Sequence, residues 1–568
     1  MARTVSIGCQ DFETIRSNDY LYIDKTQFIK EWWEQGDSVT LITRPRRFGK
    51  TLAMSMVEKF FSINYADYGY LFEGLPLWEE EKYRALQGSY PVISLSFAKA
   101  KENSFLNSRK KICQIITDLY NQYDFLPNSG KLNDNEKYFF RKVSAEMEDY
   151  VATDSLNALS GYLKKYYGKK VIILLDEYDT PMQEAYVNGY WDELAGFTRS
   201  LFNATFKTNP HLERAIMTGI TRISKESIFS DLNNLSVVTS TSDMYAESFG
   251  FTEDEVYTAL KEYGIEQQMP EVKRWYDGFS FGSRRDIYNP WSILNYLKTE
   301  KFAPYWTNTS SNSLVSKLIR EGSGKIKEAF EFLLKDESIR ATIDEQIVYD
   351  LLDQDEQAVW SLLLASGYLT VKNFETYTTE FGEWKQEYEL KLTNFEVKIM
   401  FRNMFRKWFS STDSDYNDFI KALLHDDMDA MNHYMNKVSL ATFSYFDTGK
   451  GPLGNEPERF YHGFVLGLIV ELTDKYVITS NRESGFGRYD IIMEPRRPEN
   501  DAIIIEFKVQ HSSEKNLADT VQKALEQIEE RNYQSTLLSR GIPEERIRKY
   551  GFAFCGKKVL IGNSHYAI

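Results

Sequence analysis

Cysteine is scarce in this sequence, whose 568 residues contain only Cys9, Cys113 and Cys555, all far apart. This spacing excludes a disulfide framework and a zinc site built from cysteine pairs. Long apolar runs are also missing, because stretches such as 171–175 and 464–470 fall far below the roughly 20 residues that span a bilayer. The first residues, MARTVSIGCQDF, lack the basic-then-apolar pattern of a signal peptide. These absences predict a cytoplasmic protein that has no membrane partner.

Positive charge is the minority sign, with 68 Lys and Arg against 83 Asp and Glu and a net charge of −15. That balance argues against a general polyanion binder, although a local basic groove remains compatible with it. Residues 451–568 contain 16 basic and 17 acidic residues, so the acidic excess lies upstream and leaves room for DNA contact in this tail. Hydrophobic residues make up 42% and aromatic residues 15% of the chain, which predicts well-packed cores. At roughly 150 residues per domain, the length indicates three or four units.

The first 250 residues alternate between strand-like and helix-like patterns. Residues 39–43, 171–179 and 214–221 are β-rich, and the second of these runs, VIILLDEYD, is almost wholly apolar before its acidic end. Apolar residues at helical spacing over 52–61, 108–123 and 135–150 predict helices between the strands. Strands that alternate with helices predict a doubly wound parallel sheet, in which central strands are covered on both faces.

The loop between the first strand and its helix has the features of a phosphate-binding loop. Such a loop needs a strand, backbone N–H groups that surround phosphates, a lysine, and a Ser or Thr at the helix start. Lys50 would reach the terminal phosphates, and the Thr51 hydroxyl would bind Mg²⁺. Arg44 departs from the usual pattern, since it stands where the first glycine is expected. The candidate nucleotide-binding residues here are Arg46, Arg47, Phe48, Gly49, Lys50 and Thr51.

The acidic end of the second strand supports the same interpretation. Asp176 would hold Mg²⁺ through water, and Glu177 could polarise the attacking water. The third strand ends in TGITR, whose Arg222 could offer charge to the γ-phosphate. Taken alone, the loop motif and the acidic strand end could each mark a buried strand that ends in solvated charges. The Thr–Arg pair of TGITR, taken alone, could simply lie on the surface. Together, at the ends of successive strands, they favour nucleotide binding.

Residues 251–410 have a different character. A helix is predicted over 253–263, and the aromatic passage 275–291 carries Gly and Pro and is predicted to be mostly loop and turn. A helix over 355–367, β-like runs at 368–374 and 388–392, and a helix over 396–409 follow the order of a winged helix. A helical connector that packs on its neighbours is an equally good interpretation.

The tail carries a second constellation of two acids and a lysine. Residues 495–501 form a turn-rich link between two β-runs, and a turn centred near Pro498 pairs Asp490 with Glu506, about 5 Å apart. Facing carboxylates repel unless a cation lies between them, and oxygen ligands suit Mg²⁺. Lys508 lies on the same face as Glu506 and could orient water or stabilise charge on a phosphate. The alternative is a polar hairpin face with one ion pair.

Two further residues are candidates for the same cleft. Glu458 lies on a helix predicted around 458–472, and Gln527 lies on one predicted over 514–533. His462 is more consistent with a hydrogen-bonded structural role than with a metal ligand.

With these residues identified, the sequence resembles bacterial AAA-ATPase-like proteins that carry a C-terminal PD-(D/E)xK nuclease-superfamily domain. The resemblance covers nearly the whole chain and rests on YIDKT, RPRRFGKT, LLDEYDTP, TGITRISKESIFSDLNNL, RWYDGFSFG, YNPWSILNYL, FYHGFVLGL, SNRESGFGRYDIIM and EFK. It implies that the Arg-led loop is the pattern of these relatives.

The resemblance further implies ATP and Mg²⁺ binding by Lys50, Thr51, Asp176 and Glu177. It also implies a nuclease site of Asp490, Glu506 and Lys508, with Glu458 and Gln527 less surely assigned, in which Mg²⁺ is held by Asp490, Glu506 and the Phe507 carbonyl.

These observations predict an α/β protein with three parts: an AAA-like P-loop ATPase domain (1–250), a helical lid or winged-helix-like region (251–410) and a restriction-nuclease-like domain (411–568). The leading hypothesis is an ATP-coupled, Mg²⁺-dependent DNA nuclease that could form a homo-oligomer. The main alternative is a nucleotide-dependent switch that binds a protein or nucleic-acid partner without cleavage. A third is an interaction protein in which both sites are vestigial.

Overall fold

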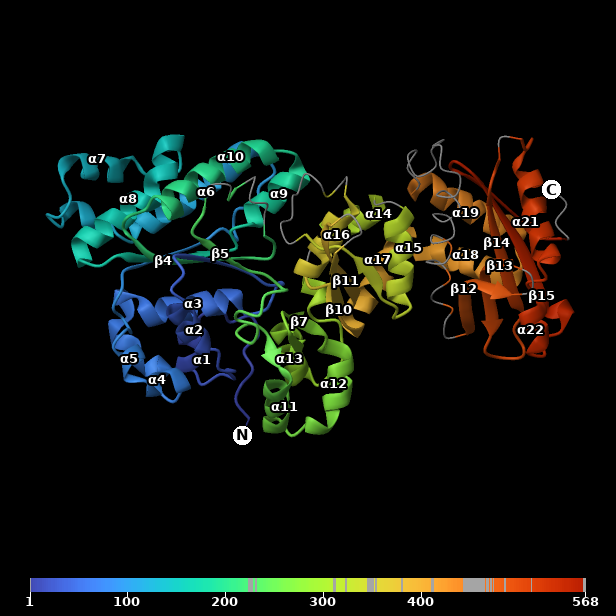
Figure 1. Ribbon diagram of the computed structural model, residues 1–568, viewed down its shortest axis with the longest axis horizontal. Helices are drawn as coiled ribbons and strands as arrows, with labels where there is room; N and C mark the ends of the chain where they lie inside the picture. The colour runs from blue at the N-terminus through green and yellow to red at the C-terminus, as the bar shows by residue number, and fades with distance from the viewer. Residues whose placement is uncertain are drawn as a thin grey trace. The chain divides into compact units, whose positions relative to one another are not determined.

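The structure is a computed structural model, in which the chain forms two compact units (Figure 1). The first unit comprises 1–314 and 340–398, and the second comprises 315–339 and 399–568. The structure describes all residues except 1, 223–227, 230–231, 310–312, 322–323, 345–351, 353–354, 379–381, 410–412, 443–464, 466–468, 470–471, 473–474, 485–486, 512 and 565–568. No helix within the described part of the chain is long and apolar enough to cross a membrane.

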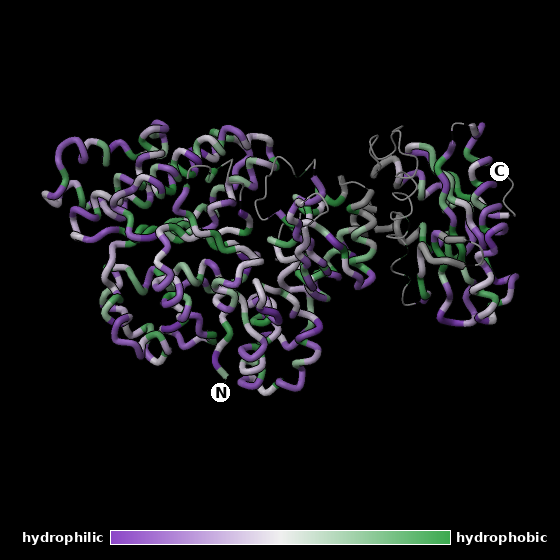
Figure 2. Tube along the Cα trace, in the orientation of Figure 1, coloured by the Kyte–Doolittle hydropathy of each residue, from purple (hydrophilic) through white to green (hydrophobic). Residues whose placement is uncertain are grey.

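The core of the first unit is a five-stranded sheet in the order β2-β3-β4-β1-β5, in which every adjacent pair is parallel. The central strands are almost entirely buried, and Figure 2 shows hydrophobic residues concentrated along them. Helices α6, α8 and α10 lie on one face and α2 and α3 on the other (Figure 1). The predicted doubly wound α/β sheet is therefore confirmed. The strands are β1 (Val39–Thr43), β2 (Val92–Ser96), β3 (Val171–Asp176), β4 (Leu212–Gly219) and β5 (Leu235–Val238).

One predicted helix is wrong. The pattern over 135–150 is two helices, because α7 ends at Lys142 and α8 begins at Asp149. Val143 takes an extended backbone and ends α7, yet Val143 and Met147 are both buried, so apolar spacing continues across the break. The helices that surround the sheet are α1 (Phe12–Ser17), α2 (Gln27–Gln35), α3 (Lys50–Phe61), α4 (Pro76–Glu79), α5 (Glu81–Arg84), α6 (Phe105–Asn121), α7 (Asp134–Lys142), α8 (Asp149–Tyr167), α9 (Thr180–Asn188) and α10 (Trp191–Phe202).

The passage 275–291 was predicted to be mostly loop, but it contains two short antiparallel strands. Gly278 allows this geometry, because its φ is +110° and a Cβ there would lie 1.9 Å from the Thr393 carbonyl oxygen. The predicted order of helix, two strands and helix further on is observed as α16, β10, β11 and α17. The elements of this region are β6 (Phe251–Thr252), α11 (Glu253–Glu262), α12 (Met269–Tyr276), β7 (Phe279–Phe281), β8 (Arg284–Tyr288), α13 (Pro290–Thr299), α14 (Ser313–Glu321), α15 (Gly324–Leu334), β9 (Ile339–Ala341), α16 (Glu356–Ala365), β10 (Leu369–Thr378), β11 (Trp384–Leu392) and α17 (Phe395–Phe409).

The second unit is built on a mixed sheet in the order β12-β13-β14-β15-β16, where only β14 and β15 are parallel. Helix α21 forms the crossover between these two strands and packs on both. Ile503, Ile505 and Phe507 belong to one core, and Ile504 belongs to another core that includes Ile528 of α21. Successive residues of β14 therefore face opposite sides, as predicted. The elements are α18 (Asp413–His425), α19 (Met428–Thr442), β12 (Tyr476–Ser484), β13 (Gly487–Pro495), β14 (Ala502–Val509), α21 (Leu517–Glu530), α22 (Ser535–Ser539), β15 (Ile547–Cys555) and β16 (Lys558–Gly562).

Candidate functional site

The loop between β1 and α3 curves over the N-terminus of α3. Gly49 has a φ of +85° and caps the helix, and Arg47 also adopts a left-handed backbone, with a φ of +66°. Left-handed residues are uncommon outside glycine and mark positions where the chain must turn sharply. The loop therefore presents the first turn of α3, with its unpaired backbone N–H groups, to the space above the sheet.

Lys50 is folded back onto its own loop. Its ammonium nitrogen donates to the carbonyl oxygens of Arg44, at 2.8 Å, and of Pro45, at 2.9 Å. The side chain is buried, and this burial lowers the pKa of Lys50 to about 8. A bound polyanion would stabilise the charged form, as is usual for the lysine of a phosphate loop.

The ends of three adjacent strands bring the predicted magnesium residues together. The Thr51 hydroxyl donates to Asp176 Oδ2 at 2.7 Å, and the Thr218 hydroxyl at the end of β4 donates to Asp176 Oδ1. Asp176 is almost completely buried at the end of β3. A hydroxyl and a carboxylate in contact at this edge form an oxygen-rich pair, which is the donor chemistry that Mg²⁺ prefers.

Two acids that follow Asp176, Glu177 and Asp179, both line a cavity above the loop, but Asp179 is also tied to the turn after β4. Glu177 has a φ of +51° and lines a cavity above the loop. Asp179 is 1% exposed and accepts hydrogen bonds from the backbone N–H groups of Ile220, at 2.9 Å, and Thr221, at 3.0 Å. Gly219 permits this approach, since a Cβ there would lie 2.8 Å from Asp179 Oδ1. Sequence reasoning missed Asp179, whose signal was the third acid of LLDEYD.

Arg44 does not line the cavity above the loop and is buried instead. Its guanidinium is fully buried, donates to the Thr239 carbonyl at 2.7 Å and the Met244 carbonyl at 3.2 Å, and lies 4.2 Å from the centre of the Phe281 ring. Burial lowers the pKa of Arg44 to about 9. The arginine in the place of the first glycine thus braces the loop against the chain that follows β5.

Two further loop residues, Arg47 and Phe48, also contact the region after residue 250, whereas the Arg46 side chain contacts α9. The Phe48 ring packs between Phe279 and Phe281, and the Arg47 guanidinium lies 4.2 Å from the centre of the Trp291 ring. The Arg46 side chain donates to Gln183 at 3.4 Å. These three residues were predicted to bind nucleotide, and all three line the cavity.

A cavity of about 450 Å³ lies above the loop. Its lining residues fall within 6–10, 20–25, 46–53, 248–251 and 290–294, with Ile15, Met56 and Glu177 among the others. The volume is in the range of small-molecule sites. In the turn directly after β4, Ile220 lines the cavity, whereas Arg222 does not.

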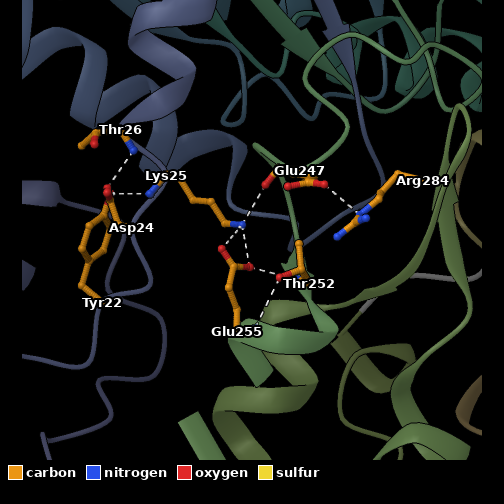
Figure 3. Close-up of polar contacts among 8 residues, drawn as sticks. All are labelled: Tyr22, Asp24, Lys25, Thr26, Glu247, Thr252, Glu255 and Arg284. Atoms are coloured by element: carbon orange, nitrogen blue, oxygen red, sulfur yellow. Dashed lines mark hydrogen bonds and ion pairs between the residues drawn. The ribbon is translucent and has the colours of Figure 1, made fainter. Parts of the chain in front are cut away.

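A polar cluster fixes one wall of this cavity (Figure 3). Lys25, which lines the cavity, donates to the Glu247 carbonyl and to both carboxylate oxygens of Glu255, each at 2.7 Å. Glu255 also forms a capping box with Thr252 at the start of α11. Arg284 pairs with the Glu247 carboxylate at 2.8 Å. The YIDKT segment therefore holds the wall segment 247–255, a role that sequence reasoning did not assign to Lys25.

In the second unit, β13 and β14 pair in the predicted register. Ile491 is opposite Ile505 and Met493 is opposite Ile503, and the next pair in this register is Asp490 with Glu506. Asp490 Oδ2 accepts a hydrogen bond from the Phe507 N–H at 2.8 Å. The two acids therefore lie next to each other at one end of the hairpin.

Helix α21 completes this acidic site. Gln527 donates from Nε2 to Glu506 Oε1 and to the Tyr533 hydroxyl at 3.0 Å. Lys508 Nζ lies 3.6 Å from Glu506 Oε1, and the Glu506 side chain is 2% exposed while that of Lys508 is 28% exposed. Burial raises the pKa of Tyr533 to about 12. The structure thus brings together Asp490, Glu506, Lys508 and Gln527, whereas Glu458 and His462 lie outside the described residues.

Both sites fit a cation that keeps part of its water shell. No cluster of three or more His, Cys, Asp or Glu side chains suited to a metal occurs in the described ranges. Thr51 with Asp176, and Asp490 with Glu506 and the Phe507 carbonyl, would hold Mg²⁺ through a few oxygen atoms. Water and phosphate oxygens supply the remaining ligands in such sites.

Two family models match segments of this chain. Residues 6–229 match the family model described as predicted AAA-ATPase, and residues 456–564 match the one described as PD-(D/E)XK nuclease superfamily. A protein of Azotobacter chroococcum mcd 1, described as an uncharacterized protein in the vnfD 5′ region, is 26% identical over 403 residues, or 70% of this chain and 68% of its own length. The first match contains the loop between β1 and α3, and the second contains Asp490 and Glu506.

Proposed function

We propose that this chain, which carries an AAA-ATPase-like domain and a PD-(D/E)XK nuclease-superfamily domain, binds and hydrolyses ATP at the first and cleaves DNA at the second. The observation that carries the proposal is the same in both domains. In the first domain, the buried Asp176 carboxylate accepts a hydrogen bond from the Thr51 hydroxyl, and Lys50 directly precedes Thr51 in the loop. In the second, the register of β13 and β14 sets Asp490 opposite Glu506, and Lys508 Nζ lies 3.6 Å from Glu506 Oε1. This combination binds and neutralises phosphate groups.

At the first site, the backbone N–H groups of 46–51 surround the β- and γ-phosphates, and Lys50 moves from its loop carbonyls onto them. Glu177 accepts the proton of the attacking water from its position in the cavity lining. The apolar side chains of Ile15, Leu52 and Met56 line the same cavity and suit the adenine base. Thr51 and Asp176 would hold Mg²⁺, which would neutralise charge on the phosphates.

At the second site, Asp490, Glu506 and the Phe507 carbonyl would hold Mg²⁺, which would supply a more acidic water and neutralise charge on the phosphate. Gln527 fixes the Glu506 carboxylate, and Lys508 orients the attacking water and stabilises charge on the scissile phosphate. DNA is the proposed substrate because the tail carries almost none of the acidic excess of the chain.

A second candidate function is a nucleotide-dependent switch that binds its partner without cleavage. The observation that favours it is the direct attachment of the phosphate loop to the region after residue 250, through Arg47 with Trp291 and Phe48 with Phe279. Nucleotide binding at such a loop can change the arrangement of the region that contacts it. A homo-oligomer that shares nucleotide sites between copies is compatible with either function.

Plasmid cleavage tests the proposal. Purified protein is incubated with supercoiled DNA and Mg²⁺, with and without ATP, as wild type, Lys50→Ala, Asp490→Asn and Glu506→Gln. Glu499→Gln, an exposed acid in the turn of the same hairpin, serves as the matched control. We expect nicking by wild type and the control, loss of at least 100-fold in both site variants, and an altered response to ATP in Lys50→Ala.

Two results would redirect the proposal. Cleavage that persists in Asp490→Asn and Glu506→Gln would exclude this site as its source. Wild-type protein that hydrolyses ATP and never cuts DNA would favour the switch.

A further inference from the structure

The backbone carbonyl of Arg46, inside the phosphate loop, accepts hydrogen bonds from two side chains of the region after residue 250. The Trp306 indole N–H donates to it at 3.0 Å, and the Asn289 side-chain amide donates at 3.3 Å. Trp306 and Asn289 are each 1% exposed, so neither bond is exchanged with solvent. The position of this carbonyl therefore depends on where these two side chains are held.

Both donors are held by one carboxylate, that of Glu396. Glu396 Oε1 accepts from the backbone N–H groups of Trp306 and of Thr307, the latter at 3.2 Å. Glu396 Oε2 accepts from the Ser292 hydroxyl at 2.9 Å, in the first turn of α13, which Asn289 caps. Two hydrogen-bonded routes from the Arg46 carbonyl thus converge on Glu396.

The carboxylate at this junction is deeply buried. Glu396 is 1% exposed, and its three hydrogen-bond donors among the described residues are all neutral. None of the ion pairs among the described residues involves it. A buried carboxylate without a cation is costly unless several donors satisfy it, and its geometry is then narrowly fixed. A side chain whose only role was packing would not need these three hydrogen bonds.

Glu396 is also the second residue of α17, which runs from Phe395 to Phe409. Residues up to Lys398 belong to the first compact unit, and those from Ile399 belong to the second. The first turn of the helix that leads into the second unit is therefore hydrogen-bonded, through Trp306, to the phosphate loop.

We infer that Glu396 is a positioning residue for the phosphate loop, acting through Trp306, and that nucleotide in the loop orders the first turns of α17. The inference rests on the proposed nucleotide binding and adds the route by which it reaches the second unit. Because coupling is reciprocal, a change in α17 also changes the affinity of the loop for nucleotide. The loop carbonyl, the indole and the carboxylate form the physical chain that carries it.

Amide hydrogen exchange of the full chain tests this inference. We expect ATP with Mg²⁺ to slow exchange in residues 395–404 of the wild type by about tenfold, within the usual range of coupling between sites. Trp306→Phe keeps a ring in place and removes the indole N–H, so ATP should still bind while this slowing is lost. Trp32→Phe is the matched control, because Trp32 is also buried in the first unit but donates its indole N–H to Thr40, at 3.1 Å. It should respond as the wild type does.

Variants of Glu396 distinguish hydrogen bonding from packing. Glu396→Gln keeps an oxygen acceptor for Trp306 and Thr307 and should retain most of the response, whereas Glu396→Ala should lose it. ATP binding by calorimetry is measured on each protein. If wild type and Trp306→Phe both bind ATP and ATP changes exchange in residues 395–404 equally in the two proteins, this inference alone is overturned. Wild-type protein that does not bind ATP overturns the proposed function and this inference with it.

Discussion

The hydroxyl of Thr51 lies 2.7 Å from Oδ2 of Asp176, although 125 residues separate them in the chain. Thr218 donates to the other oxygen of the same carboxylate, so Asp176 is held from two neighbouring elements. The contact exists because β1, β3 and β4 are adjacent parallel strands whose carboxyl ends meet at one edge of the sheet.

Replacing Thr51 with Val removes the hydroxyl and nearly preserves the side-chain shape. We expect ATP affinity in the presence of Mg²⁺ to fall at least tenfold, because a phosphate-loop hydroxyl is a direct ligand of the metal. Thr51→Ser keeps the hydroxyl and should bind within a few-fold of the wild type. Calorimetric titration with and without Mg²⁺ measures both. Wild-type affinity for Mg-ATP in Thr51→Val would show that this hydroxyl is not a ligand.

Arg44→Gly restores the residue that phosphate loops usually have at this position, yet it should damage this protein. The variant loses a buried guanidinium that donates to three carbonyl groups and packs on Phe281. We expect the free energy of unfolding to fall by about 3 kcal/mol or more. Arg285→Gly makes the same change at an exposed position and should cost about 1 kcal/mol or less. Urea denaturation compares them, and equal losses would contradict the bracing role of Arg44.

Two glycines with left-handed backbones provide a matched pair. A Cβ on Gly278 would lie 1.9 Å from the Thr393 carbonyl oxygen, whereas no atom lies within 4 Å of one on Gly264. Both have positive φ, +110° and +70°, so both substitutions to Ala strain the backbone. We expect about 1 kcal/mol of destabilisation for Gly264→Ala and about 3 kcal/mol or more for Gly278→Ala. Similar melting temperatures for the two variants would show that the backbone at Thr393 can shift away from the new Cβ at little energetic cost.

Burial raises the pKa of Glu396 from an ordinary value of 4.5 to about 7. Between these values the folded protein keeps a proton that the unfolded chain has lost, so the free energy of unfolding falls as pH rises. The contribution is fully present below pH 4.5 and is lost above pH 7, and it amounts to about 3 kcal/mol. Glu396→Gln lacks it. The melting temperature of Glu396→Gln should therefore rise relative to that of the wild type as the pH is raised from 5 to 8. Parallel curves over this range would contradict the shift.

Local patterns were enough to predict much of the architecture. Apolar runs predicted the positions of the buried strands, because a strand covered on both faces needs apolar residues throughout, as in 171–175. The turn near Pro498 predicted the pairing of β13 and β14, since register in a hairpin follows from the position of its turn. Period alone did not reveal the break between α7 and α8, because Val143 and Met147 preserve helical spacing across it.

The candidate sites show the same division. Lys50 and Thr51 could be predicted as candidates because they belong to a short motif between a strand and a helix. Asp490 and Glu506 could be predicted because the position of the hairpin turn sets them opposite each other. Asp179, Lys25 and Glu396 could not, because each acts on a segment remote in the chain: the turn after β4, the wall at 247–255, and Trp306. Nothing in the spacing of a lone acid or lysine indicates its distant partner.

The sequence by itself determined the α/β class and the register of the hairpin that carries Asp490 and Glu506. Only the tertiary structure decided that Arg44 faces inward, that Lys50 rests on loop carbonyls, and that Glu396 links the loop to α17. The reason is physical. Motifs and periodicity record what a residue does to its neighbours in the chain, whereas burial and hydrogen bonding between distant segments arise only when the chain has folded.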